Sequence, residues 1–271
     1  MSEDKKYNVV QANQFIRETS WTLKKDSIKI FKLLISRIDT KNPPKDNTVY
    51  LTKKEILNVI TDYESKSLDK YTYARNRIKE LITGVKVYDD DEHEIYTALV
   101  QKIDWNKKKE LVSVQFSDEV MKYLLVITQF LAYNVDNIRG FRSKYGILFY
   151  EYLYSEYKQY KENTFIVSVK KLRHLTATEK KHPRFMNWEK WVLQAGIDDL
   201  NRAGVEILAK YEKVKTGKEI SEIKFYLRER TSYKETRFEE VFQTSLFDDD
   251  ELIEDEERLF PWELNYNSKE E

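Results

Sequence analysis

The stretch NWEKWVLQAGIDDLN, residues 187–201, predicts a helix that has to be packed on nearly every side. Its polar residues follow one another at spacings of three and four, which places them in one narrow line along the helix. They are Asn187, Lys190, Gln194, Asp198 and Asn201. The apolar residues cover most of the circumference and are Trp188, Trp191, Val192, Leu193, Ala195, Ile197 and Leu200. Such a helix must lie deep in its domain and present one polar edge.

The other expected elements fall into the same order twice along the chain. The first half should contain a helix over 22–38, a strand at 49–51, a helix capped by Thr52 and Glu55, a helix over 71–82, and strands at 85–88 and 95–103. A strand at 110–116 and a helix over 117–125 should close it. The second half should contain a helix over 143–160, a strand at 165–169, helices over 170–176 and 187–201, and a hairpin around Thr216–Gly217.

This order of helix, strand, two helices and hairpin is that of the winged-helix form of the helix-turn-helix. Its last helix enters the DNA major groove and its hairpin, the wing, touches the backbone. We therefore predict an α+β fold with two tandem winged-helix domains and a disordered acidic C-terminal tail. We expect a first domain over 1–132 for dimerisation and DNA backbone contact, a second over 133–235 for the main DNA recognition, and the tail over 236–271.

The formal net charge is zero, but the two signs are separated along the chain. Residues 238–271 hold 13 acidic and 2 basic residues, which leaves 45 basic against 34 acidic residues in 1–237. This asymmetry favours nucleic-acid binding by the body of the protein. The alternative is a soluble body with a disordered, solvating tail.

The candidate DNA contacts of the second half surround the helix 187–201 and the hairpin after it. Asn187 and Gln194 could each pair with adenine through two hydrogen bonds, and Arg184 with guanine or phosphate. Lysines on the hairpin suit the phosphate backbone. The alternative is a solvated charged surface. The candidates are Lys170, Lys171, Arg173, Lys180, Lys181, Arg184, Asn187, Lys190, Gln194, Lys213, Lys215 and Lys218.

The first half offers a parallel set around its third helix. These candidates are Lys70, Tyr71, Tyr73, Arg75, Arg77 and Lys79. We take the hairpin around the acidic tip Asp89–Glu94 as the wing of this half. Phosphates would repel this tip, so we expect that wing to point away from DNA.

Catalysis has little support in the sequence, and we expect no enzyme, cofactor or metal. There are no cysteines, three histidines and no phosphate-binding loop of the P-loop type. The Asp/His cluster of the acidic tip and the run Asp248–Glu251 are read as solvated carboxylates rather than as metal ligands. The absence of cysteine, of a signal peptide and of a membrane-spanning run predicts a cytoplasmic protein without a membrane partner.

The tail contains one short apolar motif, Gln243-Thr244-Ser245-Leu246-Phe247. It resembles the peptide with which bacterial replication proteins bind the DNA polymerase sliding clamp. Leu246 and Phe247 could fill an apolar pocket while Gln243 forms a hydrogen bond at its rim. Alternatively, the segment packs back on the body, or the acidic run competes with DNA for the basic surface.

Three stretches resemble the replication initiator (Rep) proteins of theta-replicating plasmids. They are NVVQANQFIRETSWTLKKDSIKIFKLLISRID near the N-terminus, SKYGILFYEYL at 143–153, and WVLQAGIDDLN followed by KVKTGKEISEIKFYL. The last carries the most recognisable pattern, with Val192, Leu193, Ala195, Leu200, Asn201, Gly217, Ile223 and Phe225. It departs mildly in Thr216-Gly217-Lys218, where a Gly-Arg pair is common, and in Asp199, where Glu is frequent.

The resemblance implies a protein that binds directly repeated origin sequences (iterons) in double-stranded DNA, with both winged helices in successive major grooves. It also implies a homodimer that represses its own promoter, and recruitment of the host initiator and helicase in a plasmid-bearing bacterium. A stand-alone winged-helix repressor is the main alternative, and a DNA-processing nuclease is a third.

Overall fold

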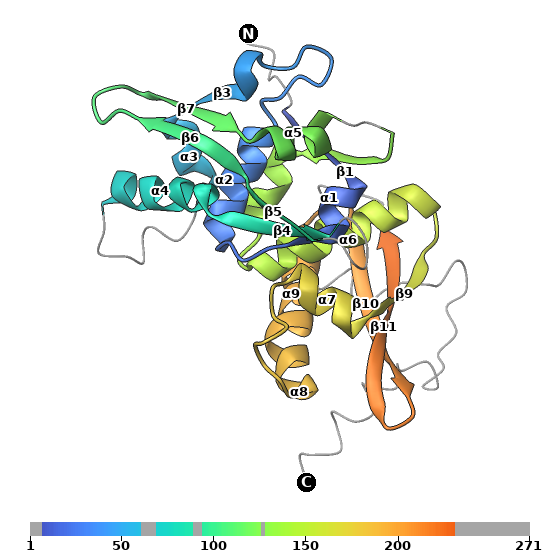
Figure 1. Ribbon diagram of the computed structural model, residues 1–271. Coiled ribbons are helices and arrows are strands. Elements are labelled where there is room, and N and C mark those ends of the chain that lie inside the picture. The colour runs from blue at the N-terminus through green and yellow to red at the C-terminus, as the bar shows by residue number, and fades with distance from the viewer. Residues whose placement is uncertain (1–6, 61–68, 89–93, 126–127, 231–271) are drawn as a thin grey trace.

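The computed structural model describes residues 7–60, 69–88, 94–125 and 128–230. Two winged-helix units lie one above the other in Figure 1, with the first unit at the top. The predicted α+β fold with two tandem winged-helix units is confirmed, whereas the predicted tail lies outside the described residues. The first unit contains β1 (Asn8–Ala12), α1 (Asn13–Glu18), β2 (Thr19–Ser20), α2 (Lys25–Ile35), β3 (Thr48–Thr52), α3 (Lys53–Val59), α4 (Lys70–Lys79), β4 (Gly84–Tyr88), β5 (Glu94–Ala98), β6 (Val100–Trp105), β7 (Leu111–Phe116), α5 (Asp118–Leu125) and β8 (Phe130–Asn134).

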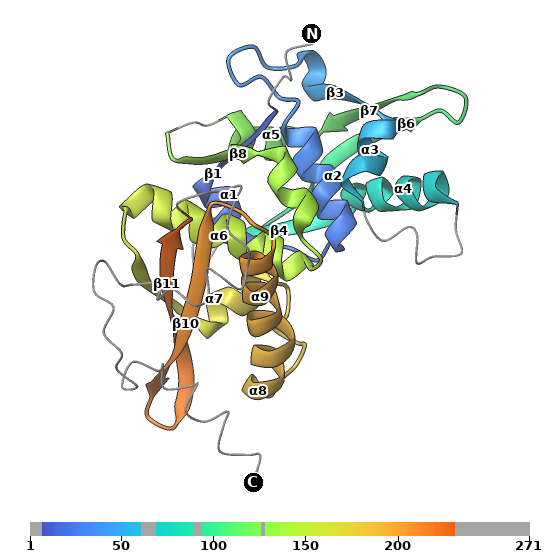
Figure 2. The same ribbon diagram turned by 180° about the vertical axis from the view of Figure 1, so that it is seen from behind.

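The second unit repeats the order around a long first helix. Its elements are α6 (Lys144–Tyr160), β9 (Thr164–Ser168), α7 (Val169–Leu175), α8 (Phe185–Trp188), a π-helical turn (Glu189–Gln194), α9 (Ala195–Arg202), β10 (Ile207–Thr216) and β11 (Glu219–Glu229). The hairpin β10–β11 and the helix from α8 to α9 extend toward the same end of the molecule (Figure 2).

Strand pairing identifies the wing of each unit. In the second unit, β9 pairs with β11, the second strand of the hairpin β10–β11. In the first unit, the equivalent strand β3 pairs with β7, the second strand of the hairpin β6–β7. The wing of the first unit is therefore β6–β7, and the assignment of the wing to the hairpin with the acidic tip is wrong. That hairpin, β4–β5, pairs with β2 in a separate sheet.

The expected strand over 95–103 is also wrong, because it is two strands in two different sheets. The chain bends at Leu99, whose side chain is fully buried, and this bend separates β5 from β6. Sequence analysis did not identify β1 and β8, which pair with each other along their whole length. The domain boundary expected after residue 132 falls inside β8.

Local signals in the sequence placed several helix ends correctly. The predicted cap of α3 is confirmed, since Thr52 accepts a hydrogen bond from the Glu55 backbone and the Glu55 carboxylate accepts one from the Thr52 backbone. The expected helix over 71–82 is α4 followed by a 3-10 turn at Glu80–Ile82.

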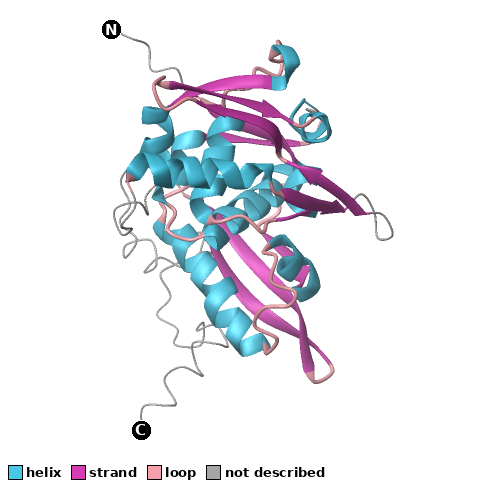
Figure 3. Ribbon diagram, turned by 60° about the vertical axis from the view of Figure 1, so that its left-hand side comes forward, coloured by secondary structure: helices cyan, strands magenta, loops and turns pink. Residues whose placement is uncertain are grey.

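A buried polar network joins α2 and α6, the first helices of the two units, which contact each other. Helices occupy the middle of the molecule, with strands above and below them (Figure 3). Lys32 on α2 is fully buried, and its Nζ lies 2.9 Å from Oε2 of Glu151 on α6. The same Nζ donates to Oε1 of Gln11 on β1 at 2.8 Å and lies 4.6 Å from the centre of the Trp21 ring. These contacts surround the ammonium group, which compensates for its removal from water.

The remaining carboxylate oxygen of Glu151 is satisfied as well. Its Oε1 accepts hydrogen bonds from Gln11 Nε2 at 2.7 Å and from Tyr133 Oη at 2.5 Å. Burial lowers the pKa of Lys32, and the facing Glu151 carboxylate opposes this effect. Burial, followed by the Glu151 charge, raises the pKa of Tyr133, so this phenol remains a neutral donor. The network thus ties β1, α2, β8 and α6 together.

We predict that the costs of losing the two partners of this ion pair are not additive. Lys32→Met leaves a buried carboxylate without its cation, and Glu151→Gln leaves a buried ammonium. Each should lower the free energy of unfolding by about 3 kcal/mol, and the double variant by clearly less than the sum. Urea denaturation measures this, with Lys122→Met at the exposed pair with Glu119 as the control. Additive losses would contradict the network.

A second lysine connects the units at the start of α6. Lys144 Nζ donates to the carbonyl oxygens of Trp21, in the first unit, at 2.9 Å and of Thr176, in the second, at 3.2 Å. Burial lowers the pKa of Lys144 from 10.5 to about 8, the charge of Lys181 adds to this effect, and Glu179 opposes it.

This pKa shift predicts a characteristic dependence of stability on pH. Between pH 8 and pH 10.5 the unfolded chain retains the Lys144 proton that the folded chain has released. The contribution of Lys144 to the free energy of unfolding should therefore rise with pH in this range, by about 1 kcal/mol per pH unit. Urea denaturation of the wild type and of Lys144→Met should give curves that diverge above about pH 8. The variant Lys190→Met controls for the loss of a surface charge, and parallel curves for Lys144→Met would contradict the prediction.

Candidate nucleic-acid interface

The loop between α7 and α8 is held by the guanidinium group of Arg173. It donates to the carbonyl oxygens of Thr178, Lys181 and His182 at 3.2, 3.0 and 3.0 Å. The guanidinium also lies 5.0 Å from the centre of the Trp188 ring. Arg173 was predicted as a DNA contact, but these bonds commit it to shaping the loop that carries Lys180 and Lys181.

Trp188 fixes the amino end of the recognition helix, by which we mean the continuous helix from α8 through the π-helical turn to α9. Its side chain is fully buried, and its Nε1 donates to Thr178 Oγ1 at 2.9 Å. Its ring lies 5.8 Å from that of Phe185, centre to centre. The helix and the preceding loop are therefore one rigid piece.

The polar line predicted on this helix is exposed along most of its length. Asn187, Lys190 and Gln194 are exposed, as is Asp198. The prediction is wrong at Asn201, which is buried. Its amide group donates to the carbonyl of Ala209 at 2.8 Å and accepts from the Ala209 backbone at 2.9 Å. Asn201 thus joins α9 to the wing strand β10.

Gln194 is exposed but its amide group is already engaged. Its Nε2 donates to Asp198 Oδ1 at 2.7 Å, and its Oε1 accepts from the hydroxyl of Tyr211 on β10 at 2.8 Å. Burial, followed by the neighbouring Glu189 carboxylate, raises the pKa of Tyr211 and keeps this hydroxyl a donor. In this arrangement Gln194 connects the helix to the wing, and pairing with adenine would require it to give up both bonds.

The apolar residues do not all pack as predicted. Trp191, expected in the core, is 57% exposed, and Met186 is 77% exposed. Trp191 follows Asn187 by four residues and precedes Gln194 by three, so helical spacing places it in the same exposed line as these polar residues. Every apolar residue of the helix was expected on its packed side, and the exposed position of Trp191 was therefore missed. Trp191 also lies within the π-helical turn at Glu189–Gln194.

The wing of the second unit presents lysines beside this helix. Lys213 lies 3.1 Å from Glu189 Oε1, which ties the wing to the π-helical turn. Lys215 and Lys218 are exposed on either side of the turn, where Gly217 adopts a positive φ of 66°. Figure 1 shows α8 and the tip of β10–β11 at the same lower end of the molecule.

The other basic candidates of this unit divide between surface and structural positions. Lys170, Lys180, Lys181 and Arg184 are exposed. Lys171 Nζ lies 3.2 Å from Glu18 Oε1 and thus forms an ion pair with the first unit.

In the first unit, α4 is the helix equivalent to the recognition helix. It is capped by Asp69, whose carboxylate accepts from the backbone of Tyr71 and Thr72 at 3.1 Å each. Tyr73, predicted as a DNA contact, is only 7% exposed, and its hydroxyl donates to the buried Asp26 on α2 at 3.0 Å. It therefore holds α4 against the core.

The remaining candidates on α4 line its outer side. Lys70, Tyr71 and Lys79 are exposed, whereas Arg75 and Arg77 are half-buried. Arg77 pairs with Glu80 one turn later at 2.9 Å.

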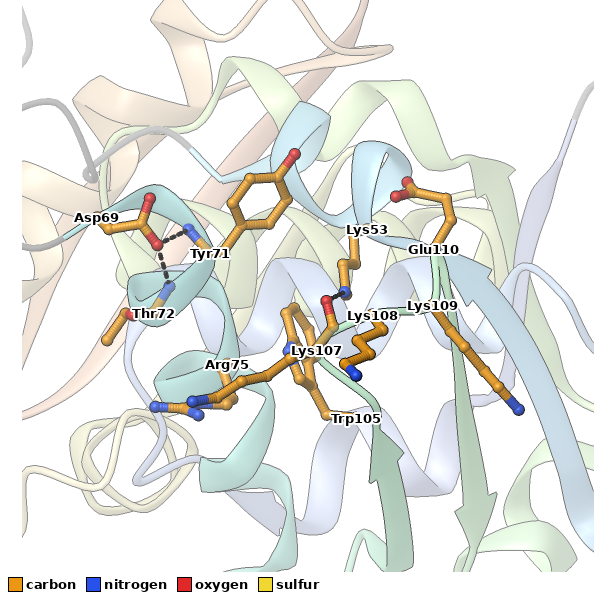
Figure 4. A pocket seen from close by; sticks show the side chains of 10 residues that line it. All are labelled: Lys53, Asp69, Tyr71, Thr72, Arg75, Trp105, Lys107, Lys108, Lys109 and Glu110. Carbon is orange, nitrogen blue, oxygen red and sulfur yellow. Dashed lines mark hydrogen bonds between the residues drawn. The ribbon is translucent and has the colours of Figure 1, made fainter.

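A basic pocket of about 570 Å³ lies between the amino end of α4 and the tip of the wing β6–β7 (Figure 4). Its wall includes Tyr71 and Arg75 from α4, and Trp105 from β6. Lys53, at the start of α3, donates to the carbonyl oxygens of Asn106 and Lys107 at 3.0 and 3.1 Å and so fixes the wing tip. The tip itself carries Lys107, Lys108 and Lys109. Sequence reasoning missed these three lysines, although the run of like charges in a turn was visible.

Several expectations fall on residues that the structure does not describe. The acidic tip lies outside the described residues except for Glu94, and so do Gln243, Leu246 and Phe247. Among the described residues, no group of three or more histidine, aspartate and glutamate side chains could hold a metal ion. No helix in that part of the chain is long and apolar enough to cross a membrane.

Comparison with solved structures gives the same two-unit arrangement. The crystal structure of the Pi initiator protein in complex with iteron DNA matches with a TM-score of 0.65 and 18% sequence identity. The match covers 85% of this chain and all of that one. A replication initiation protein of Escherichia coli is 31% identical over 98 residues, which are 35% of this chain and 30% of that protein.

Family models divide the chain between two initiator domains. The model described as "Initiator Replication protein, WH1" matches residues 8–154, and "Initiator Rep protein, WH2" matches residues 168–227. The two matches begin in β1 and end in β11, and they leave residues 155–167 between them unmatched. The chain belongs to the family of replication initiator (Rep) proteins.

Proposed function

We propose that this protein is a plasmid replication initiator that binds directly repeated origin DNA and has no catalytic activity. The observation that carries the proposal is the exposed face of the recognition helix. Asn187 and Lys190 are exposed on it and Arg184 is exposed at its N-cap, beside a lysine-tipped wing. The buried apolar residues of the same helix include Trp188, Val192, Leu193 and Leu200. Such a rigid, cationic edge suits the major groove.

Both units contribute positive charge to the proposed contact. The second unit brings Lys215 and Lys218 on its wing, and the first unit brings Lys107–Lys109 on the equivalent wing beside α4. Phosphate contacts from two units supply affinity and register, and a few base contacts supply sequence preference. Binding should therefore weaken steeply with salt.

The test is fluorescence anisotropy of the full chain on duplex DNA from upstream of its own gene. Single and multiple direct repeats are compared with scrambled duplex at physiological salt. Tight binding of one monomer per repeat is expected. Binding only as a dimer to an inverted repeat would replace the proposal with a stand-alone repressor, and equal affinity for scrambled DNA would refute repeat recognition. Mg²⁺-dependent nicking of the repeat duplex would refute the absence of catalysis.

Substitutions that remove one positive charge should show which exposed cations contact DNA. We expect Arg184→Gln and Lys190→Gln each to weaken repeat binding by about 1 kcal/mol or more. If the replaced cation contacts a phosphate, the slope of log affinity against log salt should also fall by about one unit. Lys122→Gln, on α5 at the opposite end of the molecule, should change neither quantity. Unchanged affinity in both variants would remove the recognition helix from the interface.

We further propose that the protein forms a homodimer that represses its own promoter, and that bound copies recruit the host initiator and helicase. These roles are supported by family membership, and the localisation proposed with them is the bacterial cytoplasm, where plasmid DNA lies. The tail motif with Gln243, Leu246 and Phe247 is proposed to bind the sliding clamp.

Deleting residues 243–271 should leave repeat affinity intact or raise it, because the deletion removes acidic residues that phosphates would repel. The same deletion should abolish binding to purified sliding clamp, and Leu246→Ala with Phe247→Ala should reproduce that loss alone. Weakened repeat binding by the truncated chain would show that the tail contributes to DNA binding and would contradict this prediction.

A further inference from the structure

Two large apolar side chains lie exposed in the middle of a cationic face. On the recognition helix, Trp191 is 57% exposed and Met186 is 77% exposed. A single exposed apolar side chain is ordinary on a protein surface. Trp191 is informative because it lies in the exposed line with Asn187, Lys190 and Gln194, on the face that is proposed to meet DNA. On that face its ring would require a ligand with an apolar group of its own.

We propose that Trp191 contacts the 5-methyl group of a thymine in the major groove of the repeat. The inference rests on the proposed DNA-binding function and names the base that this face reads. The thymine methyl is the one apolar group that a base pair presents in the major groove. An indole ring held against it removes apolar surface from water on both sides.

The helix geometry keeps Trp191 outward. Its neighbours Trp188 and Val192 are fully buried on the inner side of the same helix. Trp191 itself lies in the exposed line of the helix, four residues after Asn187 and three before Gln194. It also lies within a π-helical turn, and such turns recur at functional sites.

The surroundings of Trp191 favour DNA over an apolar protein surface. Lys190 Nζ lies 5.1 Å from the centre of the Trp191 ring, and Arg184 and Asn187 are exposed on the preceding turn. A protein partner with an apolar face would have to strip water from these polar groups without replacing it. DNA offers phosphates to the cations, base edges to the amide and a methyl group to the ring.

The polar groups on either side of Trp191 indicate which base should lie next to the contacted thymine. The Gln194 amide is bonded to Asp198 and Tyr211, at 2.7 and 2.8 Å. Asn187 is therefore the exposed amide best placed to pair with an adenine, next to a thymine read by Trp191. The combination predicts that the repeat contains an A·T pair under the middle of the recognition helix.

Deoxyuridine substitution tests the contact, because it removes only the methyl group and leaves every hydrogen-bonding group of thymine in place. The probe is a fluorescein-labelled duplex with one direct repeat from upstream of the gene, in which each thymine is replaced in turn. Wild-type affinity should fall about fourfold at one or two positions, the value expected for one buried methyl group. Substitutions at the other thymines should have no effect.

The variant Trp191→Ala connects the methyl group to this residue. It should bind the thymine duplex about tenfold more weakly than the wild type, and it should no longer distinguish thymine from deoxyuridine at the sensitive position. Trp191→Phe should retain part of the discrimination. Met186→Ala is the matched test of the second apolar side chain on the same face. Tyr96→Ala, which removes an exposed aromatic ring from β5, is the control and should behave as wild type.

Three results would overturn the inference. The first is wild-type binding that ignores every thymine methyl group, the second is a Trp191→Ala variant that remains sensitive to the methyl group, and the third is a Trp191→Ala variant with full affinity. Loss of self-association in that variant, with DNA binding intact, would show a protein-docking face instead. Failure of the wild type to prefer the repeat over scrambled duplex would refute the proposed function itself and this inference with it, so the two failures are distinguishable. Urea denaturation of each variant excludes unfolding as the cause.

Discussion

The buried ion pair between Lys32 and Glu151 is the interaction on which the arrangement of the two units depends. It lies where α2 and α6, the first helices of the two winged-helix units, meet. A buried ion pair of this kind adds little net stability compared with apolar residues, but an incomplete one is strongly unfavourable. Only the relative position that brings both partners together, with Gln11 and Tyr133, satisfies all these groups. The pair therefore favours the relative position of α2 and α6 that the structure shows.

The order of the elements could be predicted from the sequence because it depends on local signals, each contained within a short segment. Hydrophobic periodicity placed α2, α4 and α6, and a capping box placed the start of α3. Sequence reasoning failed where pairing between distant strands decides the structure. No local signal indicates that β3 pairs with β7 rather than with the hairpin β4–β5, and the acidic hairpin was therefore mistaken for the wing. Register between distant strands is a tertiary property.

The candidate site divides in the same way. Lysines and arginines on the surface were identified correctly as exposed at Lys170, Arg184 and Lys190. Charge alone could not show that Arg173 bonds to loop carbonyls or that Lys171 pairs with Glu18. A long cationic side chain can reach solvent or fold back onto its own backbone, and only the neighbouring loop decides which. Asn201 and Tyr73 are neutral side chains that were also predicted to be exposed, but each forms a buried hydrogen bond instead.

Strand topology gives the two units a common plan for positive charge. In each unit the strand after the first helix pairs with the second strand of a hairpin, β3 with β7 and β9 with β11. The tip of that hairpin carries lysines and lies beside the helix that corresponds to the recognition helix of DNA-binding folds. The hairpin β4–β5, which carries the acidic residues, is an addition that pairs only with β2. The run of acidic residues is therefore not the tip of either wing, although single carboxylates such as Asp104 and Glu212 lie on the wing strands. The lysines Lys107–Lys109 and the hairpin β4–β5 thus belong to different sheets, so the sheet that positions the cationic tip does not also carry the acidic hairpin.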